Sequence, residues 1–308
     1  MAIAYISHYD CQLHDMGHHH PEQPARLSAI NDRLIASGLE FVLRQYDAPL
    51  VERAKLDAVH DPDYVDEIEA ASPEDGIAWV DGDTAMNKHS LTAARRAAGA
   101  VVLGVDLVMR GEVKHVFCGV RPPGHHAERH RGMGFCLFNN IAVGARHAVD
   151  EYGLERVLVV DFDVHHGNGT EDILGGDDRF LFCSTFQHPF YPHSGYDSQI
   201  PNVVDAPLPS GAGSAEFREA VEKHWMPRIE AFAPQLVMIS AGFDAHQADD
   251  MANLNLVDRD YHWITRRLCE QADKTAEGRV VSSLEGGYDL HALARSVEAH
   301  LKAFLGEH

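Results

Sequence analysis

Short apolar runs recur along the chain, and each run stops at a cluster of polar residues. The clearest runs cover residues 2–6, 116–120, 157–160, 236–239 and 280–284. Short, mostly apolar runs without polar alternation are typical of strands buried on both faces of a parallel sheet. We therefore predict a strand at each run, with the polar clusters following the carboxyl ends of the strands.

Helical spacing of apolar residues separates these runs. We predict helices over residues 90–110, 139–152, 258–272 and 290–304. Ser90 is the expected N-cap of the first helix, and Gly111 its end. A further pattern over residues 215–232 is interrupted by Pro227. Strands that alternate with helices indicate an α/β fold, in which ligand sites form beyond the carboxyl ends of the strands.

Length and composition favour one domain. The chain has 308 residues, 45% of them hydrophobic, and no stretch rich in Pro, Gly and Ser divides it. Such a chain is long enough to bury a substantial core without disulfides. We expect residues 1–308 to form a single domain.

Cysteine usage and the absence of targeting signals favour the cytoplasm. The five cysteines are scattered and form no Cys-x-x-Cys pair, so we expect reduced thiols. The first residues show no basic segment followed by an apolar one, and no uncharged apolar run reaches the ~18 residues that a membrane span needs.

The net charge of −21 limits the partners. A field of this sign repels nucleic acid and attracts cations. We expect no nucleic-acid or membrane partner, and a substrate that carries amines is compatible with this charge. The oligomeric state stays open.

The strongest chemical pattern is the segment 161–169, Asp-Phe-Asp-Val-His-His-Gly-Asn-Gly. In an extended strand, side chains two apart share a face, so Asp163 and His165 are expected to approach one ion together. Asp161 lies two residues before Asp163 and is expected on the same face, where it would orient a neighbouring side chain. Carboxylate and imidazole are ligands of catalytic zinc. Asp244 follows another predicted strand and is the expected third ligand.

Two further clusters follow predicted strands. Residues 121–126 read Arg-Pro-Pro-Gly-His-His, and the adjacent pair His125 and His126 favours proton transfer over a structural role. Residues 285–289 read Glu-Gly-Gly-Tyr-Asp, in which the two glycines allow a tight turn that presents Tyr288. Alone, the second motif would indicate a turn tyrosine packed on the surface.

Together these motifs resemble the zinc-dependent histone deacetylase family, which includes acetylpolyamine amidohydrolases. The resemblance runs from His20-Pro-Glu22 to Tyr288 and includes the Gly134-Phe135-Cys136 segment. It implies an arginase-like α/β fold with a central parallel sheet of about eight strands. It also implies hydrolysis of a linear amide bond in an acetylated amine.

The resemblance assigns roles residue by residue. The metal ligands fall on Asp163, His165 and Asp244. The tandem histidines fall on His125 and His126, with Asp161 and Asn168 as their respective partners, and an Asn at 168 resembles the class II branch. Tyr288 matches the tyrosine that polarises the amide carbonyl. The implied cofactor is Zn²⁺, with Fe²⁺ as an alternative, and K⁺ is implied beside it through residues 161–165 and Ser184.

The substrate channel is assigned with one departure from the family. Its first phenylalanine falls on Phe135, but the second falls on Tyr191, unless the alignment slips by one residue and places Phe190 there. The other implied substrate-binding residues are Met251, Gly134, Gly286 and Asp83.

These residue types suit metal-assisted hydrolysis. Two carboxylates cancel the charge of a divalent ion, so bound water is acidified less than by a site of three histidines. A histidine base is then required, and we assign His126 as general base and acid, with His125 as an electrostatic partner.

Alternatives remain open. Met251 and Asn168 favour acetyl-lysine in peptides or proteins over an acetylated polyamine. A binuclear manganese ureohydrolase would need further carboxylates, and an inactive acyl-binding relative would lack Tyr288 or a ligand.

Overall fold

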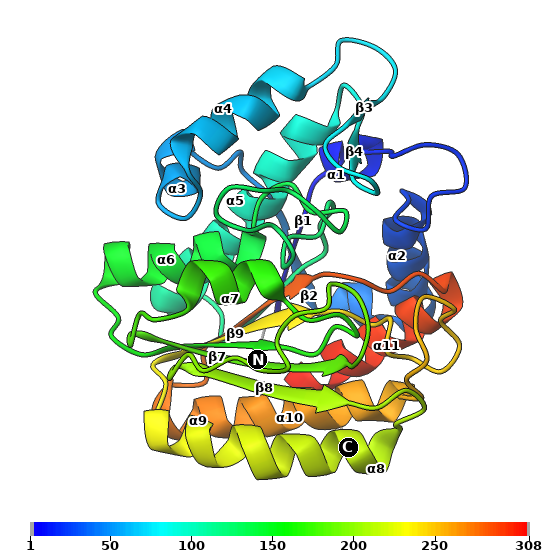
Figure 1. Ribbon diagram of the computed structural model, residues 1–308. Coiled ribbons are helices and arrows are strands. Elements are labelled where there is room, and N and C mark those ends of the chain that lie inside the picture. Colours follow the sequence, from blue (N-terminus) through cyan, green and yellow to red (C-terminus); the bar gives the residue numbers. More distant parts are fainter. Residues whose placement is uncertain (1–2, 307–308) are drawn as a thin grey trace.

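The computed structural model describes residues 3–306 and contains one large parallel sheet (Figure 1). The strands of this sheet are β1 (Ile3–Ser7), β2 (Leu43–Asp47), β5 (His115–Cys118), β6 (Val157–Asp161), β7 (Phe180–Gln187), β8 (Val203–Leu208), β9 (Leu236–Ala241) and β10 (Val280–Leu284). A separate antiparallel pair consists of β3 (Ala78–Trp79) and β4 (Ala85–Met86).

The helices lie between the strands along the chain. They are α1 (Asp10–Leu13), α2 (Ala25–Ser37), η1 (Leu39–Phe41), α3 (Arg53–Asp57), α4 (Pro62–Ala71), α5 (Ser90–Met109), α6 (Asn140–Tyr152), α7 (Asn168–Leu174), α8 (Ser214–Ala220), η2 (Val221–Trp225), α9 (Met226–Phe232), α10 (Asp258–Thr275) and α11 (Leu290–Phe304).

The sheet has eight strands in the order β2-β1-β5-β10-β9-β6-β7-β8, and all neighbouring pairs are parallel. Every residue of the four central strands, β5, β10, β9 and β6, is buried. Burial on both faces is the reason that these strands are mostly apolar. The α/β fold with about eight parallel strands is therefore confirmed.

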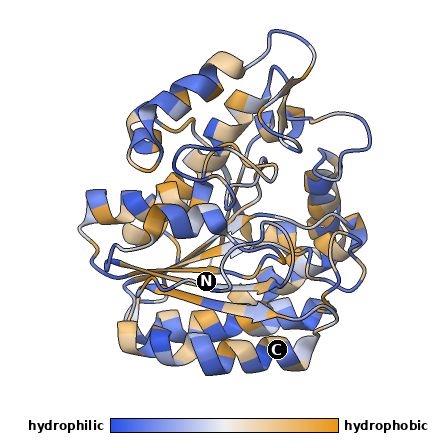
Figure 2. Ribbon diagram, viewed as in Figure 1, coloured by the Kyte–Doolittle hydropathy of each residue, from blue (hydrophilic) through white to orange (hydrophobic). Residues whose placement is uncertain are grey.

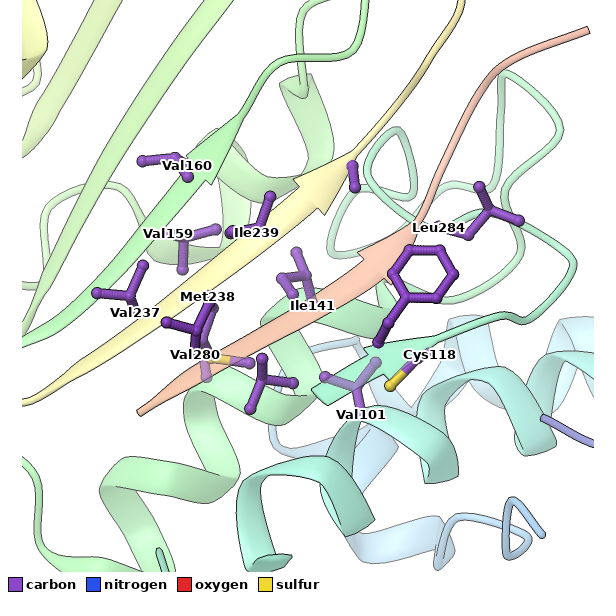
Figure 3. Packing of buried hydrophobic residues seen from close by; sticks show 14 of the residues in the cluster. Val101, Cys118, Ile141, Val159, Val160, Val237, Met238, Ile239, Val280 and Leu284 are labelled. Atoms are coloured by element: carbon purple, nitrogen blue, oxygen red, sulfur yellow. The ribbon is translucent and has the colours of Figure 1, made fainter. Parts of the chain in front are cut away.

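Helices cover both faces of the sheet. In Figure 1, α5 and α6 lie on one face, and α10 and α11 lie on the other together with α2. Figure 2 shows that the strands are largely hydrophobic while the outer helices alternate between hydrophobic and hydrophilic positions. Figure 3 shows Val159 and Met238 of the sheet in one cluster of buried residues with Val101 of α5 and Ile141 of α6. No helix within residues 3–306 is both long and apolar enough to cross a membrane.

The predicted elements agree with the structure, with small shifts at their ends. Each of the five runs is a strand, although Ala2 lies outside the described residues. Asn139 caps α6 by accepting a hydrogen bond from the Ala142 amide, whereas Ser90 is the first residue of its helix and not the cap. Pro227 does not break its helix, because the preceding turn widens into the π-helical segment η2.

Candidate functional site

The candidate site lies at the carboxyl ends of the four central strands. The segments that carry the predicted chemistry follow β5, β10, β9 and β6, which are consecutive neighbours in the sheet. Parallel strands end at one edge, so residues far apart in the sequence meet there. The sheet topology therefore gathers the predicted clusters into one place.

Asp163, His165 and Asp244 meet as a group of potential metal ligands. Their ligand atoms all lie within 4.8 Å of one another, and all three residues are buried. His165 Nδ1 is 3.0 Å from Asp163 Oδ1 and 3.3 Å from Asp244 Oδ2.

The reason for this convergence differs from the prediction. Strand β6 ends at Asp161, so Asp163 and His165 are not in an extended strand. Asp163 Oδ1 instead accepts a hydrogen bond of 2.9 Å from the His165 amide. A short Asp side chain that bonds the backbone two residues on is typical of a turn. This turn, and not strand parity, brings the two side chains to the same side.

The chemistry of this group fits a divalent cation. Asp244 Oδ2 is buried and has no hydrogen-bond partner among the described residues, although its other oxygen accepts from the Val164 amide. A Cβ at Gly286 would lie 2.2 Å from that same oxygen, so only glycine fits there. A buried carboxylate oxygen without a donor is destabilising unless a cation pairs with it.

The tandem histidines lie beside this group and have different partners. Their ring centroids are 4.0 Å apart. His125 Nδ1 is 2.8 Å from Asp161 Oδ2, and His126 Nδ1 is 2.7 Å from Asn168 Oδ1. The Asn168 amide nitrogen donates to Glu128, which identifies Asn168 Oδ1 as the acceptor and leaves the Nε2 lone pair of neutral His126 free.

The two histidines have opposite pKa shifts. Burial lowers the pKa of His125, but the carboxylates of Asp161 and Asp163 outweigh it and raise the pKa well above its ordinary value. Burial also lowers the pKa of His126, and the neighbouring charges of His125 and His165 lower it further. The surroundings therefore favour the charged form of His125 and the neutral form of His126.

Glu285 fixes the backbone of the tandem histidines, a role that sequence reasoning missed. Its Oε2 accepts from the amides of Gly124, at 2.7 Å, and His125, at 3.1 Å. Its Oε1 accepts from the Ser240 hydroxyl at 3.0 Å. Glu285 is the first residue of the Glu-Gly-Gly-Tyr motif and is therefore visible in the sequence. Its hydrogen-bond partners are not, because Gly124 and His125 lie more than a hundred residues away and Ser240 belongs to another strand.

Tyr288 is held through its backbone by Asp249, which sequence reasoning also missed. Asp249 Oδ2 accepts from the amides of Tyr288, at 2.6 Å, and Asp289, at 2.9 Å, and its Oδ1 accepts from the Met251 amide at 3.0 Å. The Arg26 guanidinium lies 5.0 Å from the centre of the Tyr288 ring. One buried carboxylate thus joins the loop of Met251 to the loop of Tyr288.

A pocket of about 140 Å³ opens above the ligand group. It is lined by Asp83, His126, Gly134, Phe135, His165, Phe190, Tyr191, Met251 and Tyr288. Gly286 does not line the pocket and instead lies below it, where its amide donates to Asp163 Oδ2 at 2.9 Å.

The pocket walls are aromatic. Phe135 meets Tyr288 edge-on at 5.9 Å between ring centroids. Phe190 stacks on His165 at 5.4 Å, and Tyr191 meets His126 edge-on at 5.3 Å. Both candidates for the second wall therefore line the pocket. The Tyr191 hydroxyl is buried there without a hydrogen-bond partner among the described residues, which distinguishes it from a phenylalanine.

Asp83 also lines the pocket and contacts two other segments of its lining. Its Oδ1 accepts from the Gly134 amide at 3.2 Å and from the Thr84 hydroxyl at 3.0 Å. The Thr84 hydroxyl also accepts from the amide of Phe135, a residue with a φ of 70°. Such a backbone is strained for a non-glycine residue and is often found at functional sites.

The remaining histidines near these segments do not line the pocket. His246 Nε2 lies 3.2 Å from Asp258, and His188 stacks on Tyr196. His18 and His19 are exposed and contact each other. His20 touches Phe135 edge-on from outside the pocket, at 4.7 Å between ring centroids.

The chain is similar to proteins of a known family. The histone deacetylase domain profile matches residues 20–304. The chain is 38% identical to the uncharacterized protein slr0245 of Synechocystis, over 98% of this chain and 99% of that protein. It is 35% identical to type-2 histone deacetylase 2 of Dictyostelium discoideum, over 97% of this chain but 20% of that protein.

A polyamine deacetylase and a domain of known structure are also similar. The polyamine deacetylase HDAC10 of Mus musculus is 35% identical, over 93% of this chain and 45% of that protein. The crystal structure of the HDA15 HD domain matches with a TM-score of 0.93 and 34% identity, covering 99% of this chain and 88% of that one.

Proposed function

This chain belongs to the histone deacetylase family, and from that premise we propose that it is a zinc-dependent amidohydrolase acting on acetylated lysine side chains of peptides or proteins. Family membership makes it a deacetylase, which is a hydrolase and requires a metal ion. The observation that carries the proposal is the meeting of Asp163, His165 and Asp244 below a narrow aromatic pocket. We propose that residues 1–308 form one catalytic domain.

Zinc is the proposed ion, with iron(II) as the alternative. The donors are one imidazole and two carboxylates, a set typical of catalytic zinc that keeps a position open for water. Bound there, the ion would act as a Lewis acid on the carbonyl and would activate water. The unpartnered Asp244 Oδ2 supports a cation at this point.

His126 is the proposed base and acid. Its depressed pKa and its Nδ1 contact with Asn168 favour a neutral ring with a free Nε2 lone pair. This ring takes the proton from the attacking water and returns it to the leaving amine. His125, charged beside Asp161, stays an electrostatic partner.

Tyr288 is the proposed donor to the carbonyl oxygen. As water adds, negative charge develops on that oxygen, and a preorganised donor stabilises the charge more than it stabilises the substrate. The support is the position of Tyr288 in the pocket wall and the anchoring of its backbone by Asp249.

The pocket walls are the proposed binding site of the substrate stem. An acetylated amine is neutral and its methylenes are apolar, which suits walls formed by Phe135, Phe190 and Tyr191. Met251 contributes an apolar side chain to the pocket, and this favours acetyl-lysine. The similarity to a polyamine deacetylase, together with the acidic Asp83 in the pocket lining, supports acetylated polyamines as the second candidate substrate.

Two further assignments accompany this function. A structural K⁺ near residues 161–165 is supported by the Ser184 hydroxyl, which is buried without a partner among the described residues and lies opposite Asp161 in the β6–β7 register. A cytoplasmic location is supported by five unpaired cysteines.

A substrate panel tests the proposal. Zinc-loaded protein is assayed on blocked acetyl-lysine peptides and on N-acetylputrescine, with Asp244→Asn as the control that lacks one ligand. We expect kcat/KM to be at least about tenfold higher on the peptides, and lost in the control. The reverse preference would assign the polyamine role, and no turnover on either substrate would refute the proposal.

A further inference from the structure

A second group of potential ligands lies next to the candidate active site. His166 follows His165 directly, and its side chain meets Glu171 of α7 and Asp205 of β8. His166 Nε2 lies 2.9 Å from Glu171 Oε2 and 3.2 Å from Asp205 Oδ1. None of these three residues lines the aromatic pocket, so they are separate from the substrate site.

This group is enclosed by the protein. The side chains of His166, Asp205 and Glu171 are 1%, 7% and 15% exposed, respectively. The His166 ring packs against Phe186, with ring centroids 4.7 Å apart, and Gly195 lies so close that a Cβ there would be 2.6 Å from the ring. Water therefore has little access to the charges of the group.

The polar atoms of the group lack hydrogen-bond partners among the described residues. These atoms are His166 Nε2, Glu171 Oε2 and both carboxylate oxygens of Asp205. Their mutual distances are short, but the directions do not meet the geometry of a hydrogen bond. Buried polar atoms in this state are rare in folded proteins and call for a ligand.

The charges of the group also do not balance. Two carboxylates face one imidazole, so a negative charge remains even when His166 is protonated. Within residues 3–306, neither Glu171 nor Asp205 has an ion pair with any lysine or arginine.

We propose that His166, Glu171 and Asp205 bind a second divalent ion of the zinc type. One imidazole and two carboxylates form a donor set that zinc accepts, with water as the fourth ligand. In a tetrahedral site with bonds of about 2.0–2.1 Å, donors lie about 3.3 Å apart. The distances from His166 Nε2 to Glu171 Oε2, 2.9 Å, and to Asp205 Oδ1, 3.2 Å, need to widen by only a few tenths of an ångström.

Two serines contact the proposed ligand side chains and fix their orientation, as hydrogen-bond partners do around metal sites. Ser194 Oγ lies 2.9 Å from His166 Nδ1, so a neutral ring that donates there directs its Nε2 lone pair at the carboxylates. The Ser198 hydroxyl donates to Glu171 Oε1 at 2.7 Å and leaves Oε2 for the ion. Both serines belong to the segment that follows Phe190 and Tyr191.

The role of this ion is structural. It joins α7, the edge strand β8 and, through the serines, the segment that carries the aromatic pocket walls. Helix α7 also begins with Asn168, the partner of His126. The ion takes no part in the hydrolysis, and its ligands are distinct from Asp163, His165 and Asp244.

Metal content of the full-length chain tests the proposal. Protein stripped with a chelator is reloaded with ZnSO₄, passed through a desalting column and measured by plasma mass spectrometry. We expect two zinc ions per wild-type chain, one in Asp205→Asn, one in Asp244→Asn and none in the double variant. Asp197→Asn, which removes an exposed acid from the same loop, is the matched control and keeps two.

Two results of the zinc measurement would overturn the proposal. One zinc in the wild type with none in Asp244→Asn, or two zinc ions retained in Asp205→Asn, means that the second group is only an ion pair. A binuclear centre that shares ligands would instead lose both ions in Asp244→Asn. These results do not depend on turnover, so failure of the proposed deacetylation is a separate outcome.

Two measurements cover variants that do not fold. Glu171→Gln, which keeps the size of the side chain, should also hold one ion, with folding verified by circular dichroism. Crystals of zinc-loaded wild type should give an anomalous peak between His166, Glu171 and Asp205. A peak at Asp163, His165 and Asp244 alone would refute the second site.

Discussion

At the residue scale, the site is built from identical side chains in different surroundings. His125 and His126 are adjacent, yet one faces the carboxylate of Asp161 and the other faces the amide of Asn168. The carboxylate favours the charged ring, whereas the amide accepts a hydrogen bond without adding charge. The residue that contacts Nδ1, Asp161 or Asn168, thus helps to decide which histidine is available as a base.

Tyr288 gives the most direct prediction at this scale. The change Tyr288→Phe removes one donor to the developing charge and should lower kcat by roughly 10²–10³-fold, as for the loss of an oxyanion donor. The measurement is steady-state turnover on an acetyl-lysine peptide, with bound metal determined on the same sample. Metal-replete variant protein with near-normal kcat would remove Tyr288 from the mechanism.

At the scale of elements, buried carboxylates join loops that come from different strands. Glu285, after β10, holds the amides of Gly124 and His125, which follow β5. Asp249, after β9, holds the amides of Tyr288 and Asp289, which follow β10. Charged acceptors of amide hydrogen bonds are stronger than neutral ones, so these contacts fix the positions of the loops.

Asp249→Asn should therefore impair catalysis while leaving the metal ligands intact. An amide has one acceptor oxygen, so it cannot serve all three amides that Asp249 serves. We expect kcat to fall about tenfold or more, because Tyr288 loses its fixed position, with a smaller change in KM. Kinetics on a blocked acetyl-lysine peptide separate the two parameters.

The neighbouring Asp250→Asn is the matched control, since Asp250 is exposed and has the same charge. Its kcat on the neutral peptide should stay close to that of the wild type. Equal losses in the two variants would show that loop charge, and not the amide contacts of Asp249, determines turnover.

At the scale of the whole molecule, the net charge of −21 acts on charged substrates. Salt screens charges over about 10 Å at 0.1 M ionic strength. Raising the ionic strength from about 0.05 to 0.3 M should raise KM for an acetylated polyamine with free amines, and should leave KM for a blocked acetyl-lysine peptide unchanged. Equal responses of the two substrates would remove charge attraction from the account.

Buried neutral histidines should make the fold sensitive to acid. Burial lowers the pKa of His60 and His115 to about 4 and that of His300 to about 3, from 6.5. Between pH 6.5 and 4 the unfolded chain binds these protons and the folded chain does not. Above pH 6.5 these histidines are neutral in both states and do not lower the free energy of unfolding. As the pH falls below 6.5, each histidine lowers the free energy of unfolding by roughly 1.4 kcal/mol per pH unit.

Urea unfolding of the metal-free protein between pH 6.5 and 5 measures this slope. His115→Gln should reduce it by about one proton, because His115 has a buried ring nitrogen without a hydrogen-bond partner among the described residues. An unchanged slope in a folded variant would mean that His115 is already protonated in the native state.

The sequence alone determined the class of fold and the order of the chemical segments. Strands buried on both faces are mostly apolar, and β5, β6, β9 and β10 could be recognised in the sequence for that reason. The edge strand β2 was not, because it exposes polar residues such as Arg44 and Gln45 and has no apolar run. The polar residues at the strand ends were equally visible, because they follow the apolar runs directly. Since parallel strands end at one edge of the sheet, these residues were expected to lie together.

Only the tertiary structure decided which of those residues touch. The turn at Asp163, the amides held by Asp249, and the group of His166 with Asp205 all depend on directions of side chains in space. Local pattern encodes burial and periodicity, which act between near neighbours in the chain. Hydrogen bonds and ion pairs between segments depend on how loops close over the sheet, and no single segment of the sequence contains that information.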